Sequence, residues 1–185
     1  MKKSTLYIGM AMLMSTAFAH ASDPTESATV TITGNVSGSN PGASCGVYPS
    51  LNSININQMG NDIVEQGSEP DVMGLVTLRV ANPDDLSGCN AEIAAGHIAL
   101  KLHGQADDAQ GTSLANTERR SPASGVAIGL FNYDTKEIIA INDTVLDIDK
   151  DSNSAKLGLE LVKLAGQNMT DGNVKGSLTI DIIRL

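Results

Sequence analysis

Hydrophobic and polar residues alternate with a period of two along most of the chain, which is the pattern of β-strands with one buried face. Residues 29–33 read Thr-Val-Thr-Ile-Thr, and residues 53–57 place Ile54 and Ile56 between polar neighbours. The same alternation predicts further strands at 75–80, 97–102, 126–131, 144–148, 157–162 and 177–183.

Gly, Asn, Asp, Ser and Pro fill the gaps between these stretches, which is the turn chemistry of an all-β sandwich. A helix competes only at 155–165, where Leu157, Leu161 and Leu164 also fit a helical spacing, although Leu157, Leu159 and Leu161 fit a strand equally well. No repeat and no break in composition marks a second domain. We therefore predict one all-β domain.

The first 21 residues resemble an export signal. Lys2 and Lys3 are followed by an apolar run at 6–18 and by Ala19-His20-Ala21, a small-residue cleavage site. The run has 13 residues, fewer than the roughly 20 that a membrane-spanning helix needs, so the alternative of a membrane anchor is less favoured. We expect a mature chain that begins at Ser22, with cleavage after Ala19 as the alternative.

Composition narrows the classes of function. The 185 residues include 12 basic and 21 acidic side chains, for a net charge of -9, which argues against a nucleic-acid surface. Aromatic residues make up 3% and Trp is absent, which argues against base-stacking platforms and aromatic sugar sites. The two cysteines, Cys45 and Cys89, predict an intrachain disulfide in an exported chain. Two free thiols or an intermolecular bridge are the alternatives.

The N-terminal part of the mature chain predicts a detachable strand. Val30, Ile32, Gly34 and Val36 share one face, and the sequence Ser-Gly-Ser-Asn-Pro-Gly at 37–42 follows as a flexible linker. A glycine in the buried row weakens a strand unless another chain segment approaches closely there. The alternative is an ordinary first strand of a closed sandwich.

The C-terminal part predicts a strand whose edge must be covered. From Gly172 onward, one face carries Val174, Gly176, Leu178, Ile180 and Ile182, and we expect the chain to end inside this strand. A hydrophobic strand without a partner exposes backbone donors and acceptors and is an aggregation hazard.

Taken together, these motifs resemble the pilin subunits of chaperone-usher fimbriae, of the type 1 kind. The resemblance rests on the glycine-containing N-terminal strand, the two cysteines, the stretch 123–130, and Gly172 as the fourteenth residue from the end with alternating hydrophobic residues after it. The chain departs from that family at Arg184, where an aromatic residue is usual, and in its longer segment between Gly34 and Cys45.

The resemblance implies an incomplete immunoglobulin-like β-sandwich at 45–185 that lacks its last strand, preceded by a donor-strand extension and linker at 22–44. It also implies a structural subunit of a surface fimbria, exported through the periplasm and polymerised head to tail in support of cell adhesion. Its partners would be neighbouring subunits, a periplasmic chaperone and an outer-membrane usher. The implied donor residues are Val30, Ile32, Gly34 and Val36, and the implied acceptor groove is Gly172, Val174, Leu178, Ile180 and Ile182.

The sequence holds little that suggests catalysis. Asp147, Asp149, Asp151 and Asn153 alternate like the first half of a calcium loop, but Ser152 and Gly158 stand where that loop needs Gly and Glu. His97 and His103 have no third zinc ligand at a telling spacing. Because the motifs of hydrolases and phosphate-binding loops are missing, we expect no enzyme activity, cofactor or metal. A self-contained secreted sandwich or a lectin-like adhesin that binds a carbohydrate or host ligand is the alternative function.

Overall fold

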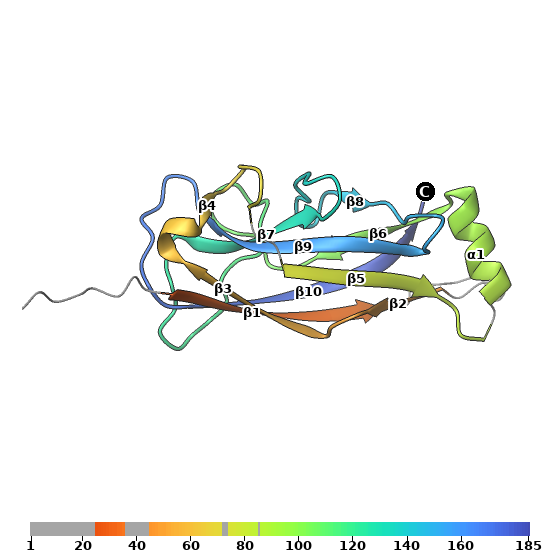
Figure 1. Cartoon of the computed structure of the whole chain (residues 1–185), viewed down its shortest axis with the longest axis horizontal. Coiled ribbons are helices and arrows are strands. Elements are labelled where there is room, and N and C mark those ends of the chain that lie inside the picture. Colours follow the sequence, from red (N-terminus) through yellow and green to blue (C-terminus); the bar gives the residue numbers. More distant parts are fainter. Residues whose placement is uncertain (1–24, 36–44, 72–73, 85) are drawn as a thin grey trace, which may run out of the picture.

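A computed structural model describes residues 25–35, 45–71, 74–84 and 86–185, and it shows two facing β-sheets (Figure 1). The first sheet has the order β3-β1-β10-β6-β8, and the second has β2-β5-β9-β4 with β7 paired to β9. The prediction of an all-β protein is confirmed. The strands are β1 (Thr25–Asn35), β2 (Gly46–Pro49), β3 (Ser53–Met59), β4 (Val64–Glu65), β5 (Gly74–Ala81), β6 (Ile98–His103), β7 (Val126–Asn132), β8 (Val145–Leu146), β9 (Ser154–Lys163) and β10 (Asn173–Arg184).

The period of two places the core between the sheets. In β5, Val76, Leu78 and Val80 are fully buried while the residues between them are partly or fully exposed. The ambiguous segment 155–165 forms most of strand β9, and its Leu157, Leu159 and Leu161 are fully buried. The strand spacing prevails over the helical one here because β9 pairs along its length with both β5 and β7.

Among the described residues, two short helical elements lie between the strands, and the sequence analysis predicted neither. Helix α1 (Leu86–Ala95) lies at one end of the molecule, and the 3-10 helix η1 (Gly60–Asp62) follows β3 (Figure 1). In α1, Cys89 and Ile93 lie one turn apart and are both buried. This buried pair, with the exposed Leu86 one turn before it, was the available signal. No helix in the described part of the chain is long and apolar enough to cross a bilayer.

A second, smaller apolar cluster covers the outer face of the β7–β9 pair. Ala127, Phe131, Val162 and Leu164 are buried together there, with Val64 packed against them. These residues alternate with the core-facing residues of β7 and β9, so β7 is buried on both of its faces.

The long connection between β6 and β7 is ordered by one carboxylate. Asp107 accepts hydrogen bonds from the backbone N–H groups of Ala109, Gln110, Gly111 and Ser113, at 2.8 to 3.1 Å. Burial alone would raise the pKa of Asp107, but these four donors outweigh that effect and hold its pKa below the usual value. The loop is therefore tied to the ionised form of this side chain.

Candidate functional site: strand β1 and its groove

Strand β1 lies between β3 and β10 and pairs with both. Its pairing with β10 is parallel, from Ser27 opposite Asn173 to Asn35 opposite Asp181, and its pairing with β3 is antiparallel, from Thr25 opposite Met59 to Thr31 opposite Ser53. We call the space between β3 and β10 the β1 groove. Without β1, the backbone groups of both flanking strands in this stretch would lack their sheet partner.

The buried face of β1 completes the core. Val30 is 0% and Ile32 is 2% exposed, whereas Thr31 between them is exposed. In register, Val30 lies opposite Gly176, and Ile32 lies opposite Leu178. At roughly 1.5–3 kcal/mol for each fully buried aliphatic side chain, these two residues contribute about 3–6 kcal/mol of gross hydrophobic stabilisation.

The structure places the predicted donor residues as follows. Val30 and Ile32 point into the core, and the backbone of Gly34 lies opposite Ile180. Val36 lies outside the described residues. In this structure, the strand that fills the groove therefore comes from the same chain, whereas the sequence analysis expected it from a neighbouring copy.

The predicted groove residues fall into three kinds. Val174, Leu178 and Ile180 are buried on β10 along the register of β1. Ile182 lies beyond the end of that register and pairs with Leu100 of β6 instead. Gly172 precedes β10 with φ +155°, and a Cβ there would lie 2.4 Å from the backbone nitrogen of Ala123. Its role in the structure is to let the 121–123 loop approach the start of β10.

Two residues of β3 were missing from the predicted groove. Ile54 and Ile56 are buried on β3 and form the second wall, opposite Val30 and Ala28 in register. Their alternation with polar neighbours was recognised as a strand. Nothing in the local pattern identified that strand as a neighbour of β1.

A buried polar network links the two sheets near the start of β1. Gln58 of β3 donates from Nε2 to Oε1 of Glu160 at 3.0 Å, and its Oε1 accepts from the N–H of Leu161 at 2.7 Å. Glu160 is 0% exposed, and its other carboxylate oxygen accepts from the N–H of Asp71 at 3.0 Å. These bonds fix β3 against β9 where β3 crosses towards β4, so one wall of the β1 groove is held firmly to the second sheet.

The predicted disulfide is confirmed. Cys45 and Cys89 are bonded, with their Cα atoms 5.4 Å apart, and both are buried. The bond joins the residue before β2 to α1, so the chain is fixed directly after the segment 36–44 that leads from β1. A structural disulfide indicates a non-cytoplasmic, oxidising compartment.

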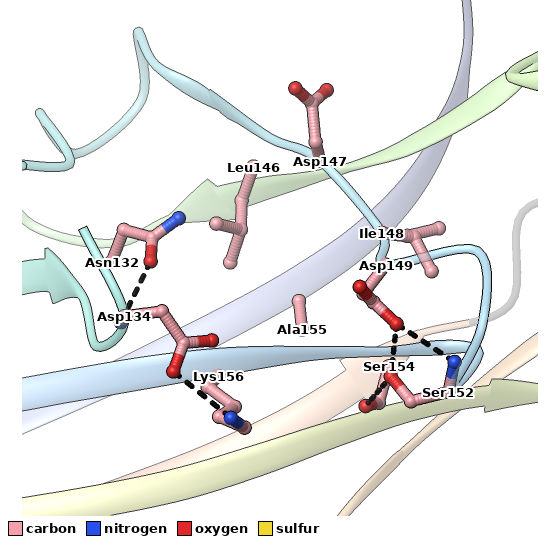
Figure 2. Close-up of a pocket in the computed structure, with 10 residues that line it drawn as sticks. All are labelled: Asn132, Asp134, Leu146, Asp147, Ile148, Asp149, Ser152, Ser154, Ala155 and Lys156. Atoms are coloured by element: carbon pink, nitrogen blue, oxygen red, sulfur yellow. Dashed lines mark hydrogen bonds and ion pairs between the residues drawn. The ribbon is translucent and has the colours of Figure 1, made fainter.

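A second candidate site is an open cleft of about 430 Å³ beside β8 and the start of β9 (Figure 2). Its apolar side chains are Leu146, Ile148 and Ala155. At one side Lys156 donates to Asp134 at 2.9 Å, and at the other Asp149 accepts from the backbone N–H of Ser152 at 2.8 Å and from its hydroxyl at 2.7 Å. These bonds raise the pKa of Lys156 and lower that of Asp149. Lys156 and Asp134 are thus paired with each other, and Asp149 is engaged by Ser152.

The residues considered as metal ligands do not converge. Figure 2 shows Asp147 pointing away from Asp149, whose carboxylate closes the turn onto Ser152. Nδ1 of His97 lies 3.5 Å from Oε2 of Glu92, and Nε2 of His103 lies 3.6 Å from Oδ2 of Asp181. The two histidines thus belong to separate pairs. Within the described ranges, no three His, Cys, Asp or Glu side chains are grouped so that they could hold a metal ion.

Neither the protein-family models nor the curated proteins gave a match to this sequence.

Proposed function

We propose that this protein is a structural subunit of a surface fimbria, and that it polymerises head to tail by placing its β1 strand into the β1 groove of a neighbouring copy. The observation that carries this proposal is the position of β1, which lies between β3 and β10 in the sheet and buries Val30 and Ile32. β1 is joined to the rest of the chain only through 36–44, so it can be exchanged without breaking any other strand pair. Addition of a strand from another molecule to a sheet is a general mode of association.

The proposal includes a specific fold. Residues 45–185 form an immunoglobulin-like sandwich that lacks one strand, and residues 22–44 are its extension and linker. With β1 removed, the first sheet would have a gap between β3 and β10. Exchange between copies fills each gap with the same strand, so Val30 and Ile32 are again available to cover the apolar groove.

The direction of β1 decides whether the assembly closes. In this structure Asn35 lies opposite Asp181, near the end of the molecule that carries α1 and the disulfide. Exchange in the same direction joins like ends of two copies and closes a two-fold dimer. Exchange with β1 reversed relative to β10 joins unlike ends and leaves both free to add further copies. The fimbrial proposal therefore requires the reversed, antiparallel seat in the assembled state.

The proposal includes the route of export. Residues 1–21, outside the described residues, act as a cleaved signal, and the disulfide suits an oxidising compartment on the way to the cell surface. A periplasmic chaperone covers the β1 groove before assembly, and an outer-membrane usher delivers subunits to the fibre. The protein supports adhesion through the fibre and acts by assembly rather than by catalysis.

One observation favours a second function. The β1 groove is already filled by β1 of the same chain. The protein is therefore also suited to be a self-contained secreted sandwich or a lectin-like adhesin that binds a carbohydrate or host ligand. The two functions differ in whether β1 ever leaves its own groove.

The test compares residues 22–185 with a variant whose residues 22–35 are moved behind Leu185 through a short Gly/Ser turn. A strand attached there starts from the end where β10 finishes, so it enters the groove antiparallel to β10. A control carries the moved strand with Ile32→Asp. We expect the unmodified chain to form fibres by electron microscopy, the moved-strand variant to stay monomeric and more heat-stable, and the control to lose that gain. An unmodified chain that remains monomeric after prolonged incubation at high concentration would favour the self-contained sandwich.

A further inference from the structure

A positively charged cleft lies at the end of the molecule where β10 begins. This open cleft of about 580 Å³ is lined by Thr117, Glu118, Arg119, Arg120, Lys175 and Ser177. Three cationic side chains thus meet on a chain whose net charge is -9. We call Arg119, Arg120 and Lys175 the basic rim.

The cations of the basic rim form no close ion pair among the described residues, although the charges of Lys175 and Arg120 help to lower the pKa of Glu118. None of the ion pairs among the described residues involves Arg119, Arg120 or Lys175. The carboxylate of Glu118 accepts from the backbone N–H groups of Arg119 and Arg120, both at 2.7 Å, and these bonds lower its pKa. Glu118 therefore shapes the loop while both guanidinium groups stay exposed.

The loop that carries the rim is held to β10. Asn116 accepts from the N–H of Lys175 at 3.0 Å and donates to the carbonyl of Asn173 at 3.0 Å. The N–H of Thr117 donates to the carbonyl of Lys175 at 2.8 Å. This rigid attachment places the basic rim beside the entrance of the β1 groove, because β1 and β10 begin at the same end.

The opposite end of the molecule carries the complementary charge. The turn at 147–151 reads Asp-Ile-Asp-Lys-Asp, and its three aspartates are exposed. It leads into Ser154, which pairs with Arg79 at the end of β5, on the side of α1 and the C-terminus (Figure 1). We call this segment the acidic turn. A head-to-tail contact joins these two ends in adjacent copies.

We propose that the basic rim of one copy docks the acidic turn of the next copy during assembly. This inference rests on the proposed function and adds the surface that brings two copies together before the strand is exchanged. Exposed ion pairs add little to equilibrium stability, but complementary patches accelerate association and do so most at low salt. The expected effect therefore lies in the rate of fibre formation.

The experiment uses two charge-reversal variants of residues 22–185. R119E/R120E reverses the rim, and D147K/D151K reverses the turn while sparing Asp149, which is needed to bond Ser152. We expect each variant alone to assemble about tenfold or more slowly at low salt, and an equimolar mixture to recover the wild-type rate, because reversed rim then meets reversed turn. In 0.5 M NaCl the differences should vanish, since the screening length falls to a few ångströms.

A control of equal charge change, K101E/K136E, alters neither surface and should assemble at the wild-type rate. A wild-type rate for R119E/R120E, or a mixture as slow as its components, overturns the inference. Loss of retention on a heparin column with normal assembly also overturns it, in favour of a polyanionic ligand. Hydrogen exchange of the β1 amides separates the two proposals: if β1 is never released in the wild type, the proposed function itself fails.

Discussion

The detachment of β1 can be measured by weakening the core on the far side of the second sheet. Phe131 is 2% exposed and belongs to the outer cluster of Ala127, Val162 and Leu164, so a sheet separates it from β1. Phe131→Ala destabilises the globally folded state without altering any contact of β1. If β1 can leave while the rest of the sandwich stays folded, this substitution should not affect its release.

The magnitude follows from burial. Removing a buried Phe side chain costs about 3–5 kcal/mol, which corresponds to an increase of roughly 100-fold to 4,000-fold in global opening. Ile32→Ala costs about 2–5 kcal/mol and weakens both the seat of β1 and the global fold, because Ile32 is exposed in both open states.

The assay is native-state hydrogen exchange, which resolves opening reactions by residue. In Phe131→Ala, the amides of β9 should exchange faster by that factor and the amides of β1 by much less. In Ile32→Ala, exchange should accelerate for the amides of both β1 and β9. Thr31→Ala, at an exposed position on the same strand, should change neither exchange rate appreciably. Phe131→Leu offers a milder version if the alanine variant does not fold.

Equal acceleration of β1 and β9 amides in the Phe131 variants would refute the reasoning. It would mean that β1 opens only when the whole sandwich unfolds. The strand would then be an integral part of a closed fold.

Three further predictions address other parts of the structure. A T31C/S177C disulfide joins directly opposed residues of β1 and β10 and should abolish fibre formation until reductant is added; fibres from the oxidised protein would contradict exchange of β1. Gly172→Ala should lower the unfolding free energy by at least about 2 kcal/mol, because its Cβ would lie 2.4 Å from the backbone of Ala123; Gly166→Ala, with nothing within 4 Å, should cost less in the same denaturant titration. Because the pKa of Asp107 is lowered in the folded protein, its contribution to stability is present above the usual Asp pKa and is lost as the pH falls through the lowered value. Asp107→Asn should therefore be less stable at pH 7, and its unfolding free energy should depend less on pH in acid. An unchanged acid profile would contradict this assignment.

The strands could be predicted from sequence because each buries one face. Thr29 to Ile32 and Ser53 to Asn57 show this plainly, and both form strands at those positions. Helix α1 was missed because it has only 10 residues, and its Leu86, Cys89 and Ile93 stand among small and polar residues that give little helical periodicity. Glu160 could not be recognised as buried, since its position on β9 alternates with the core-facing leucines. It is covered where Gln58 of β3 and the backbone at Asp71 reach its two carboxylate oxygens.

The groove could be predicted in part for a similar reason. The alternating residues of β10 indicated an apolar face, and Val174, Leu178 and Ile180 are buried on it. Which strand lies beside that face depends on long-range pairing, so Ile54 and Ile56 were not assigned to it. The alternation of β1 is satisfied equally by its own groove and by that of another copy, and the sequence pattern therefore cannot distinguish the two.

The central claim is that β1 fills the groove of another copy in the assembled protein. A photo-crosslinking amino acid can be introduced at position 31, on the exposed face of β1. This unlabelled chain is mixed with isotope-labelled chain that lacks the probe, and the mixture is allowed to assemble. Mass spectrometry of the assembled fraction should show cross-links from position 31 to β3 or β10 peptides that carry the heavy isotope. Cross-links confined to light peptides at every degree of assembly would show that each chain keeps its own strand, and would contradict the account.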